Sequence, residues 1–183
     1  MDDIQDNNDT LLTIYELEDI LNANGKLCHG FGILFCFGTS LVSQIIQTKT
    51  KIDDDEIVPS HALIIWGNSI LESTTDKVHI HNKTIPAGVR CWMLKDWIDN
   101  EKRKLTKYYF YPTKNIDTLL AMDLVHLPYG VDTIIDFLLK NKSEGDKTHG
   151  LICSQFVNKC TKLSKQRCPS PADLYRIVKD LKR

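Results

Sequence analysis

The residues that could do chemistry in this sequence begin with a cysteine placed where a short apolar run becomes an amphipathic helix. The stretch reads Gly150-Leu151-Ile152-Cys153-Ser154-Gln155-Phe156-Val157. A thiol at the N-terminus of a helix lies at the positive end of the helix dipole, which favours the thiolate. The placement therefore indicates a nucleophilic Cys153, whereas the simpler interpretation is a small buried hydrophobe. A nucleophile also needs a base and a group that orients the base.

A histidine and a glutamate on one expected hairpin could supply these two groups. His61 lies near the start of the expected strand Ser60–Trp66. The turn Gly67-Asn68 follows, and Glu72 lies on the next strand, Ser69–Thr74. Pairing about the turn places position 66 opposite 69 and position 63 opposite 72, so Glu72 lies two residues along the ladder from His61. A carboxylate there would fix the tautomer of the imidazole. In the alternative interpretation, the Glu72 side chain points to solvent.

A second histidine and a second cysteine lie close to this stretch in the sequence. His149, four residues before Cys153, is a rival base. We rank it below His61 because a residue so near in sequence would lie on the loop beneath the nucleophile rather than opposite it. Cys160 follows Cys153 by seven residues on the same helix face and is expected in the core.

The order of the expected elements predicts an α+β fold, with strands in the middle of the chain and helices at both ends. We expect a disordered head over 1–10 and a single domain over 11–183, built around one central antiparallel sheet packed by helices. Thr13, followed three residues later by Glu16, predicts a capping box at the first helix. The expected strands span 32–37, 60–66, 69–74, 88–93 and 107–112. Besides the helix that begins near Cys153, the expected helices span 13–21, 41–47, 94–100, 116–126, 131–140 and 172–182.

Composition restricts the classes of function. The chain has 23 Lys and Arg against 24 Asp and Glu, a balance that gives no electrostatic case for a nucleic-acid partner. No apolar run reaches the length of a transmembrane helix, and the acidic N-terminus is unlike a secretory signal. We therefore expect no integral membrane association and a cytoplasmic protein, or one packaged into a virion from the cytoplasm. The six cysteines form no CxxC pair, which fits a reducing compartment.

Two clusters of metal-binding residue types occur in the sequence. His79 and His81, with His29 or Cys91, could suggest zinc, but their spacing matches no usual structural-zinc pattern. The acidic run Asp53-Asp54-Asp55-Glu56 lacks the spaced oxygens of a calcium loop and fits a solvated loop better. We therefore predict neither a metal nor a cofactor.

Six short motifs follow one another along the chain, and their order carries a resemblance. They are Gly32-Ile33-Leu34-Phe35, Ser60-His61, Leu71-Glu72-Ser73, Gly88-Val89-Arg90, Leu127-Pro128-Tyr129-Gly130 and Cys153-Ser154-Gln155-Phe156-Val157. In this order they resemble the circularly permuted branch of the NlpC/P60 papain-like superfamily. That branch contains YiiX-like proteins, lecithin:retinol acyltransferase-like proteins and a poxviral subgroup. The similarity runs from about Leu27 to Asp173, and the order of His before Cys differs from that of ordinary papain.

The sequence departs from the family pattern at three positions. Ile33 follows Gly32 where an aspartate is usual, Ala62 replaces a valine, and Gln155 replaces a glutamate. None of these is a candidate catalytic position, so the departures bear on the subfamily and therefore on the substrate.

The resemblance implies a permuted papain-like fold and a catalytic set in which Cys153 is the nucleophile, His61 the general base and Glu72 the third polar residue. It also implies substrate-binding roles for Tyr129 and Ser154, although a packed aromatic is the alternative for Tyr129. The expected activity is hydrolysis of an amide bond (peptide, isopeptide or peptidoglycan-type) through a thioester. The alternatives are a lipid acyltransferase or esterase, and a binding or virion-associated module that keeps the fold without turnover.

Overall fold

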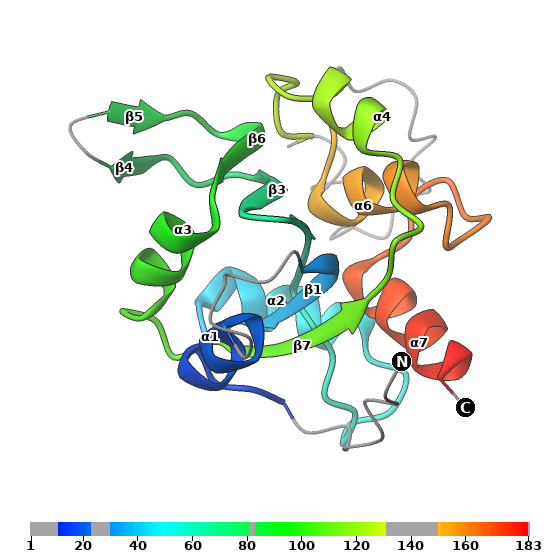
Figure 1. Cartoon of the computed structure of the whole chain (residues 1–183). Coiled ribbons are helices and arrows are strands. Elements are labelled where there is room, and N and C mark those ends of the chain that lie inside the picture. The colour runs from blue at the N-terminus through cyan, green and yellow to red at the C-terminus, as the bar shows by residue number, and fades with distance from the viewer. Residues whose placement is uncertain (1–10, 23–29, 81–82, 131–149, 183) are drawn as a thin grey trace, which may run out of the picture.

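A five-stranded antiparallel sheet forms the middle layer of the protein, and helices cover both of its faces (Figure 1). The computed structural model describes residues 11–22, 30–80, 83–130 and 150–182. The strand order is β6-β3-β2-β1-β7. The strands are β1 (Phe31–Phe37), β2 (His61–Trp66), β3 (Ser69–Thr74), β6 (Gly88–Met93) and β7 (Lys107–Pro112). This arrangement confirms the expected α+β class with a central antiparallel sheet packed by helices.

The sheet is buried on both faces because its strands are almost wholly apolar. Along β1, Ile33 and Phe35 face one core, whereas Leu34 and Cys36 face the other. The first core contains residues of α6 (Cys153–Thr161) and α7 (Pro171–Leu181), with α4 (Thr118–Asp123) beside them. The second contains residues of α1 (Ile14–Asn22) and α3 (Leu94–Glu101). The remaining helix, α2 (Leu41–Thr50), lies between β1 and β2 in the chain and contacts α7.

The hairpin formed by β2 and β3 has the predicted register. Trp66 pairs with Ser69 and Ile64 with Leu71, as expected from a two-residue turn. Gly67 has a φ of +57°, a left-handed conformation that glycine adopts without a steric penalty. The turn therefore fixes which residues of the two strands face each other, and this register places His61 and Glu72 on one face of the sheet.

Hydrogen bonds at the start of α1 confirm the predicted capping box. The backbone N–H of Thr13 donates to Glu16 Oε2 at 2.6 Å, and the N–H of Glu16 donates to Thr13 Oγ1 at 3.2 Å. Two N–H groups that lack partners within the helix are thereby satisfied.

The helix expected over 116–126 is shorter in the structure, where α4 spans Thr118–Asp123. The Asp117 side chain accepts a hydrogen bond from the N–H of Leu120 at 3.0 Å and so sets the start of the helix. Beyond its end, His126 adopts a φ of 77° and donates its N–H to the carbonyl of Val89 at 2.8 Å. Pairing with β6 thus draws the chain out of the helix, a long-range effect that periodicity does not report.

Other expected elements differ in smaller ways. The helix expected over 41–47 extends to Thr50, whose hydroxyl donates to the carbonyl of Ile46 at 2.9 Å. A two-stranded sheet of β4 (Val78–Ile80) and β5 (Lys83–Ile85) was not predicted. The expected head 1–10, the expected helix 131–140, Cys28, His29, His81 and His149 lie outside the described residues.

Candidate active site

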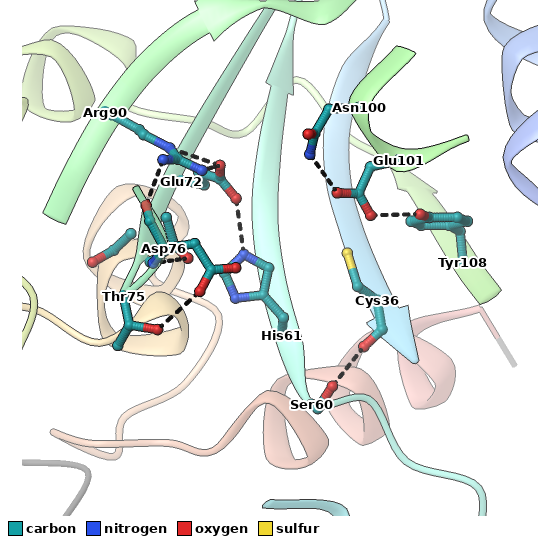
Figure 2. Close-up of polar contacts among 12 residues, drawn as sticks. Cys36, Ser60, His61, Glu72, Thr75, Asp76, Arg90, Asn100, Glu101 and Tyr108 are labelled. Carbon is teal, nitrogen blue, oxygen red and sulfur yellow. Dashed lines mark hydrogen bonds and ion pairs between the residues drawn. The ribbon is translucent and has the colours of Figure 1, made fainter. Parts of the chain in front are cut away.

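Glu72 lies within hydrogen-bonding distance of His61, as Figure 2 shows. Glu72 Oε2 is 3.1 Å from His61 Nε2. His61 is the first residue of β2, and Glu72 lies on β3 directly after Leu71, which pairs with Ile64 of β2. The Glu72 residue is only 4% exposed, so the alternative in which it points to solvent is wrong. The hairpin therefore orients the imidazole of His61, because its Nε2 atom is hydrogen-bonded to the Glu72 carboxylate.

Cys153 is the first residue of α6 and lines the same cavity as His61. Its sulfur interacts with the His61 ring and with the backbone N–H groups of Ala62 and Ser154. Because His61 Nε2 faces Glu72, the other ring nitrogen, Nδ1, is the one available to the thiol. The structure thus brings together at one cavity the three predicted catalytic residues, His61, Glu72 and Cys153.

The charges of this trio are coupled. Burial acts to raise the pKa of the Cys153 thiol, but the His61 imidazolium and the neighbouring backbone N–H groups outweigh it, so the pKa lies below its ordinary value. Burial acts to lower the pKa of His61, but the Cys153 thiolate and the Glu72 carboxylate outweigh it and raise the pKa to about 10. Both directions favour a thiolate–imidazolium pair near neutral pH.

Glu72 remains ionised although it is buried. Burial acts to raise its pKa, but the hydrogen bond from His61 and the charge of Arg90 outweigh it and lower the pKa to about 2. A carboxylate that stays charged can support the imidazolium through a catalytic cycle, which is the role of the third residue in a triad.

The N-terminus of α6 is held by two side chains. The side-chain oxygen of Gln155 accepts a hydrogen bond from the N–H of Ile152 at 3.2 Å. The hydroxyl of Ser73 donates to the carbonyl of Leu151. Since Ser73 follows Glu72 on β3, the two side chains point to opposite faces of the strand. The strand therefore carries the carboxylate on one face and, on the other, holds the chain segment that precedes Cys153.

The two residues predicted to bind substrate differ in their surroundings. Tyr129 lines the cavity near Cys153 and is half-buried, and burial together with the negative charge of Cys153 raises the pKa of its hydroxyl. Ser154 is fully buried, and within the described part of the chain its hydroxyl has no hydrogen-bond partner. The Ser154 hydroxyl is thus enclosed by protein, whereas its backbone N–H reaches the sulfur of Cys153.

The segment that carries Tyr129 is clamped on both sides. Tyr129 forms a parallel bridge with Leu151, and the N–H of Leu151 donates to the carbonyl of Pro128 at 3.1 Å. On the other side, the N–H of Val89 donates to the carbonyl of Leu127 at 2.8 Å. The segment thus links β6 to the residues that precede Cys153.

A cavity of about 660 Å³ opens over the trio, a volume in the range of small-molecule sites. It extends from Cys153 and Tyr129 over His61 to the C-terminal end of α3. The walls come from the N-terminal turn of α2, the residues that end and follow β3, and the residues that follow α3, and they include Ser43, Thr75, Asp76, Asn100 and Lys104. Charged and apolar side chains both line it, so its walls alone do not select one sign of charge.

Arg90, for which the sequence predicts no role, lies directly opposite Glu72 on β6. Its Nε and Nη2 atoms donate to Glu72 Oε1 at 2.9 Å and 2.6 Å (Figure 2). The signal in the sequence was a basic residue, Arg90, on an otherwise apolar strand, because such a residue needs an acidic partner on a neighbouring strand. Recognising it required the β3–β6 pairing, which no turn in the sequence specifies.

The other polar clusters have structural surroundings. His79 Nδ1 lies 3.0 Å from Thr84 Oγ1 within the β4–β5 pair. Among residues 11–22, 30–80, 83–130 and 150–182, no group of three or more His, Cys, Asp or Glu side chains could hold a metal ion. The acidic run is not wholly solvated, because Glu56 forms an ion pair with Arg176 at 2.6 Å. Cys160 lies in the core, as expected.

Comparison of the chain with protein-family models, with curated proteins and with solved structures finds no match. Of the helices in the described part of the chain, none has the length and apolar character needed to cross a membrane. The structure thus defines an α+β protein in which a cysteine, a histidine and a buried carboxylate meet at one cavity.

Proposed function

We propose that this protein is a cysteine hydrolase that cleaves an amide bond through a thioester intermediate. One observation carries the proposal: His61 bonds a buried, ionised Glu72 through one ring nitrogen and interacts with Cys153 at a helix N-terminus. This is the arrangement of nucleophile, base and orienting group that covalent acyl transfer requires. The resemblance to the circularly permuted NlpC/P60 proteins, stated above from motif order, agrees with it.

The proposed reaction begins from the thiolate of Cys153, which attacks the carbonyl carbon of the substrate. The backbone N–H of Cys153, in the first turn of α6, has no acceptor within the helix and can donate to the oxyanion. The His61 imidazolium then gives its proton to the leaving amine as the carbon–nitrogen bond breaks. Neutral His61 next takes a proton from water, which attacks the thioester; the acid is released, and the Cys153 thiolate leaves to restore the thiolate–imidazolium pair.

Tyr129 and the walls of the cavity would hold the acyl part of the substrate. Tyr129 lies beside Cys153, and Asp76 and Lys104 line the same cavity. An amide or peptide substrate offers both hydrogen-bond donors and acceptors to such a mixed surface. The choice among peptide, isopeptide and peptidoglycan-type amides therefore depends on the pairing of these side chains with substrate groups.

The test is a substrate panel with matched variants. Wild type and Cys153→Ala are incubated with peptides, isopeptides, peptidoglycan fragments and acyl esters, and a thioester on Cys153 is sought by mass spectrometry. Cys160→Ala, on the same helix but in the core, is the control. We expect turnover and an acyl adduct in wild type and in the control, and neither in Cys153→Ala. Equal turnover by wild type and Cys153→Ala would contradict the proposal.

A second candidate, an acyl-ester or lipid acyl substrate, is favoured by one specific observation. Leu41 and Val42, at the start of α2, are 73% and 58% exposed, and Val42 lines the cavity. Apolar side chains at the mouth of a site suit an acyl chain better than water. Preferential cleavage of the long-chain esters in the panel would favour this candidate over amide hydrolysis. A folded protein without turnover, in which Cys153 reacts with iodoacetamide no faster than Cys91, would favour the binding module.

A further inference from the structure

Arg90 divides the two oxygens of Glu72 between two partners. Two of its nitrogens, Nε and Nη2, both donate to Glu72 Oε1, which leaves Oε2 to His61. Arg90 is 6% exposed and Glu72 is 4% exposed, so neither can exchange its partner for bulk water. Because Arg90 holds Oε1 and His61 holds Oε2, the two oxygens of the carboxylate are anchored separately and its plane is fixed between the two partners.

The third nitrogen of the same guanidinium reaches the wall of the cavity. Arg90 Nη1 donates to the backbone carbonyl of Asp76 at 2.7 Å. Asp76 follows β3 closely, and Thr75 and Asp76 both line the cavity beside His61. The guanidinium also lies over the ring of Trp92, with 4.8 Å from its central carbon to the ring centroid. Arg90 is thus held by a carboxylate, a backbone carbonyl and an aromatic face at once.

We propose that Arg90 is a positioning residue. It orients the Glu72 carboxylate toward His61, and through its third nitrogen it also fixes the cavity wall at Asp76. The role rests on the proposed function, since it presumes that His61 activates Cys153. A buried ion pair of this kind is weak evidence for stability, because the cost of removing both charges from water offsets their attraction. The division of the Glu72 oxygens between Arg90 and His61 is what points to positioning.

Loss of the guanidinium would change the acid–base behaviour of the whole trio. Without the nearby cation the buried Glu72 carboxylate would protonate more readily, and the His61 imidazolium, on which the Cys153 thiolate depends, would lose part of its support. Both effects move the onset of thiolate reactivity toward higher pH. Arg90→Lys keeps the charge, but a single ammonium group cannot reproduce the planar fork that spans Glu72 and Asp76.

The chain contains a matched control for this test. Arg176 also makes two bonds to one carboxylate, with Nε and Nη2 donating to the two oxygens of Glu56 at 2.7 Å and 2.6 Å. Its Nη2 also donates to a backbone carbonyl, that of Thr50, at 2.7 Å. Neither Arg176 nor Glu56 lines the cavity that contains Cys153. Arg176→Gln therefore removes a comparable arginine–glutamate fork without touching the proposed site.

The experiment measures the rate of Cys153 alkylation by iodoacetamide in the full chain, by mass spectrometry, from acid to mildly alkaline pH. For Arg90→Gln we expect the rise of the alkylation rate with pH, the acid limb of the profile, to move to higher pH by about one unit or more. Arg90→Lys should restore the position of the limb but keep a severalfold lower plateau rate. Arg176→Gln should superimpose on wild type. Near-ultraviolet circular dichroism of each variant reports whether it is folded.

The outcomes separate the two proposals. Suppose that alkylation of wild-type Cys153 begins at a lower pH than that of Cys91, but the pH profiles of Arg90→Gln and Arg90→Lys both superimpose on the wild-type profile. The positioning role is then wrong and the proposed function stands. If wild-type Cys153 reacts no faster than Cys91 at any pH, the proposed function falls and the positioning role falls with it. Should Arg90→Gln not fold, Arg90→Lys decides: a plateau rate equal to wild type would overturn the positioning role.

Discussion

The hydroxyl of Ser73 donates a hydrogen bond to the carbonyl of Leu151, and this contact joins the two distant parts of the chain that meet at the candidate active site. Ser73 follows Glu72, and Leu151 precedes Cys153 by two residues. Because successive side chains of a strand point to opposite faces, Glu72 reaches His61 on one face while Ser73 reaches the Cys153 segment on the other. The relative position of acid and nucleophile therefore depends on one strand.

Ser73→Ala should both destabilise the protein and slow the alkylation of Cys153. The substitution removes this donor from the buried Leu151 carbonyl, which keeps the N–H of Gly130 at 3.3 Å, so we expect the free energy of unfolding to fall by about 1 kcal/mol. We also expect slower alkylation of Cys153 by iodoacetamide, because the segment before it is no longer fixed. Urea unfolding and timed mass spectrometry measure the two effects. Thr113→Ala, whose hydroxyl accepts from Asn115 in a surface turn, should change neither by a comparable amount.

Glu72→Gln should reduce the thiolate fraction of Cys153 near neutral pH. The substitution keeps the shape of the side chain but removes the charge that supports the His61 imidazolium, so the pKa of His61 should fall. We expect the thiolate absorbance in the ultraviolet, taken as the difference from Cys153→Ala, to decrease, and alkylation at neutral pH to slow about tenfold. Glu56→Gln, in the other arginine–glutamate fork, is the control. An unchanged difference spectrum would show that Glu72 does not support the ion pair.

The same carboxylate predicts how stability depends on pH. The pKa of Glu72 in the folded protein, about 2, lies below the ordinary value, so its contribution is present above about pH 4.3 and is lost as the pH falls through 2. The difference in unfolding free energy between wild type and Glu72→Gln should therefore narrow as the pH falls from about 4.3 toward 2. Urea titrations over this range measure it. A constant difference would mean that Glu72 is not preferentially ionised in the folded state.

Gly150→Ala should displace the segment before the nucleophile. A Cβ at Gly150 would lie 2.5 Å from the carbonyl oxygen of Pro128 and 2.8 Å from the carbonyl carbon of Tyr129, both of them backbone atoms that cannot rotate away. We expect a loss of about 1–3 kcal/mol in unfolding free energy and slower alkylation of Cys153. The comparison variant is Gly67→Ala, which meets no atom within 4 Å but has a φ of +57°. It should cost about 1–2 kcal/mol through backbone strain and leave Cys153 reactivity unchanged.

Sequence was sufficient for the features that depend on neighbours along the chain. The turn at Gly67 determined the register that places Glu72 beside His61, and the spacing of Thr13 and Glu16 determined the first helix cap. The α+β class followed from the order of apolar runs. In the hairpin and the helix cap the hydrogen bonds connect residues close in sequence, so the pattern of residue types is enough to specify them.

Tertiary structure alone decided which distant residues face one another. The pairing of Arg90 with Glu72, the bond from Ser73 to Leu151 and the cavity over Cys153 all join segments whose separation in the chain carries no turn signal. Strand order and helix placement are selected by the burial of apolar surface over the whole sheet, which is non-directional and does not name partners. Sequence therefore determined which residues could perform the chemistry, and the packing of the sheet decided which polar neighbours position them.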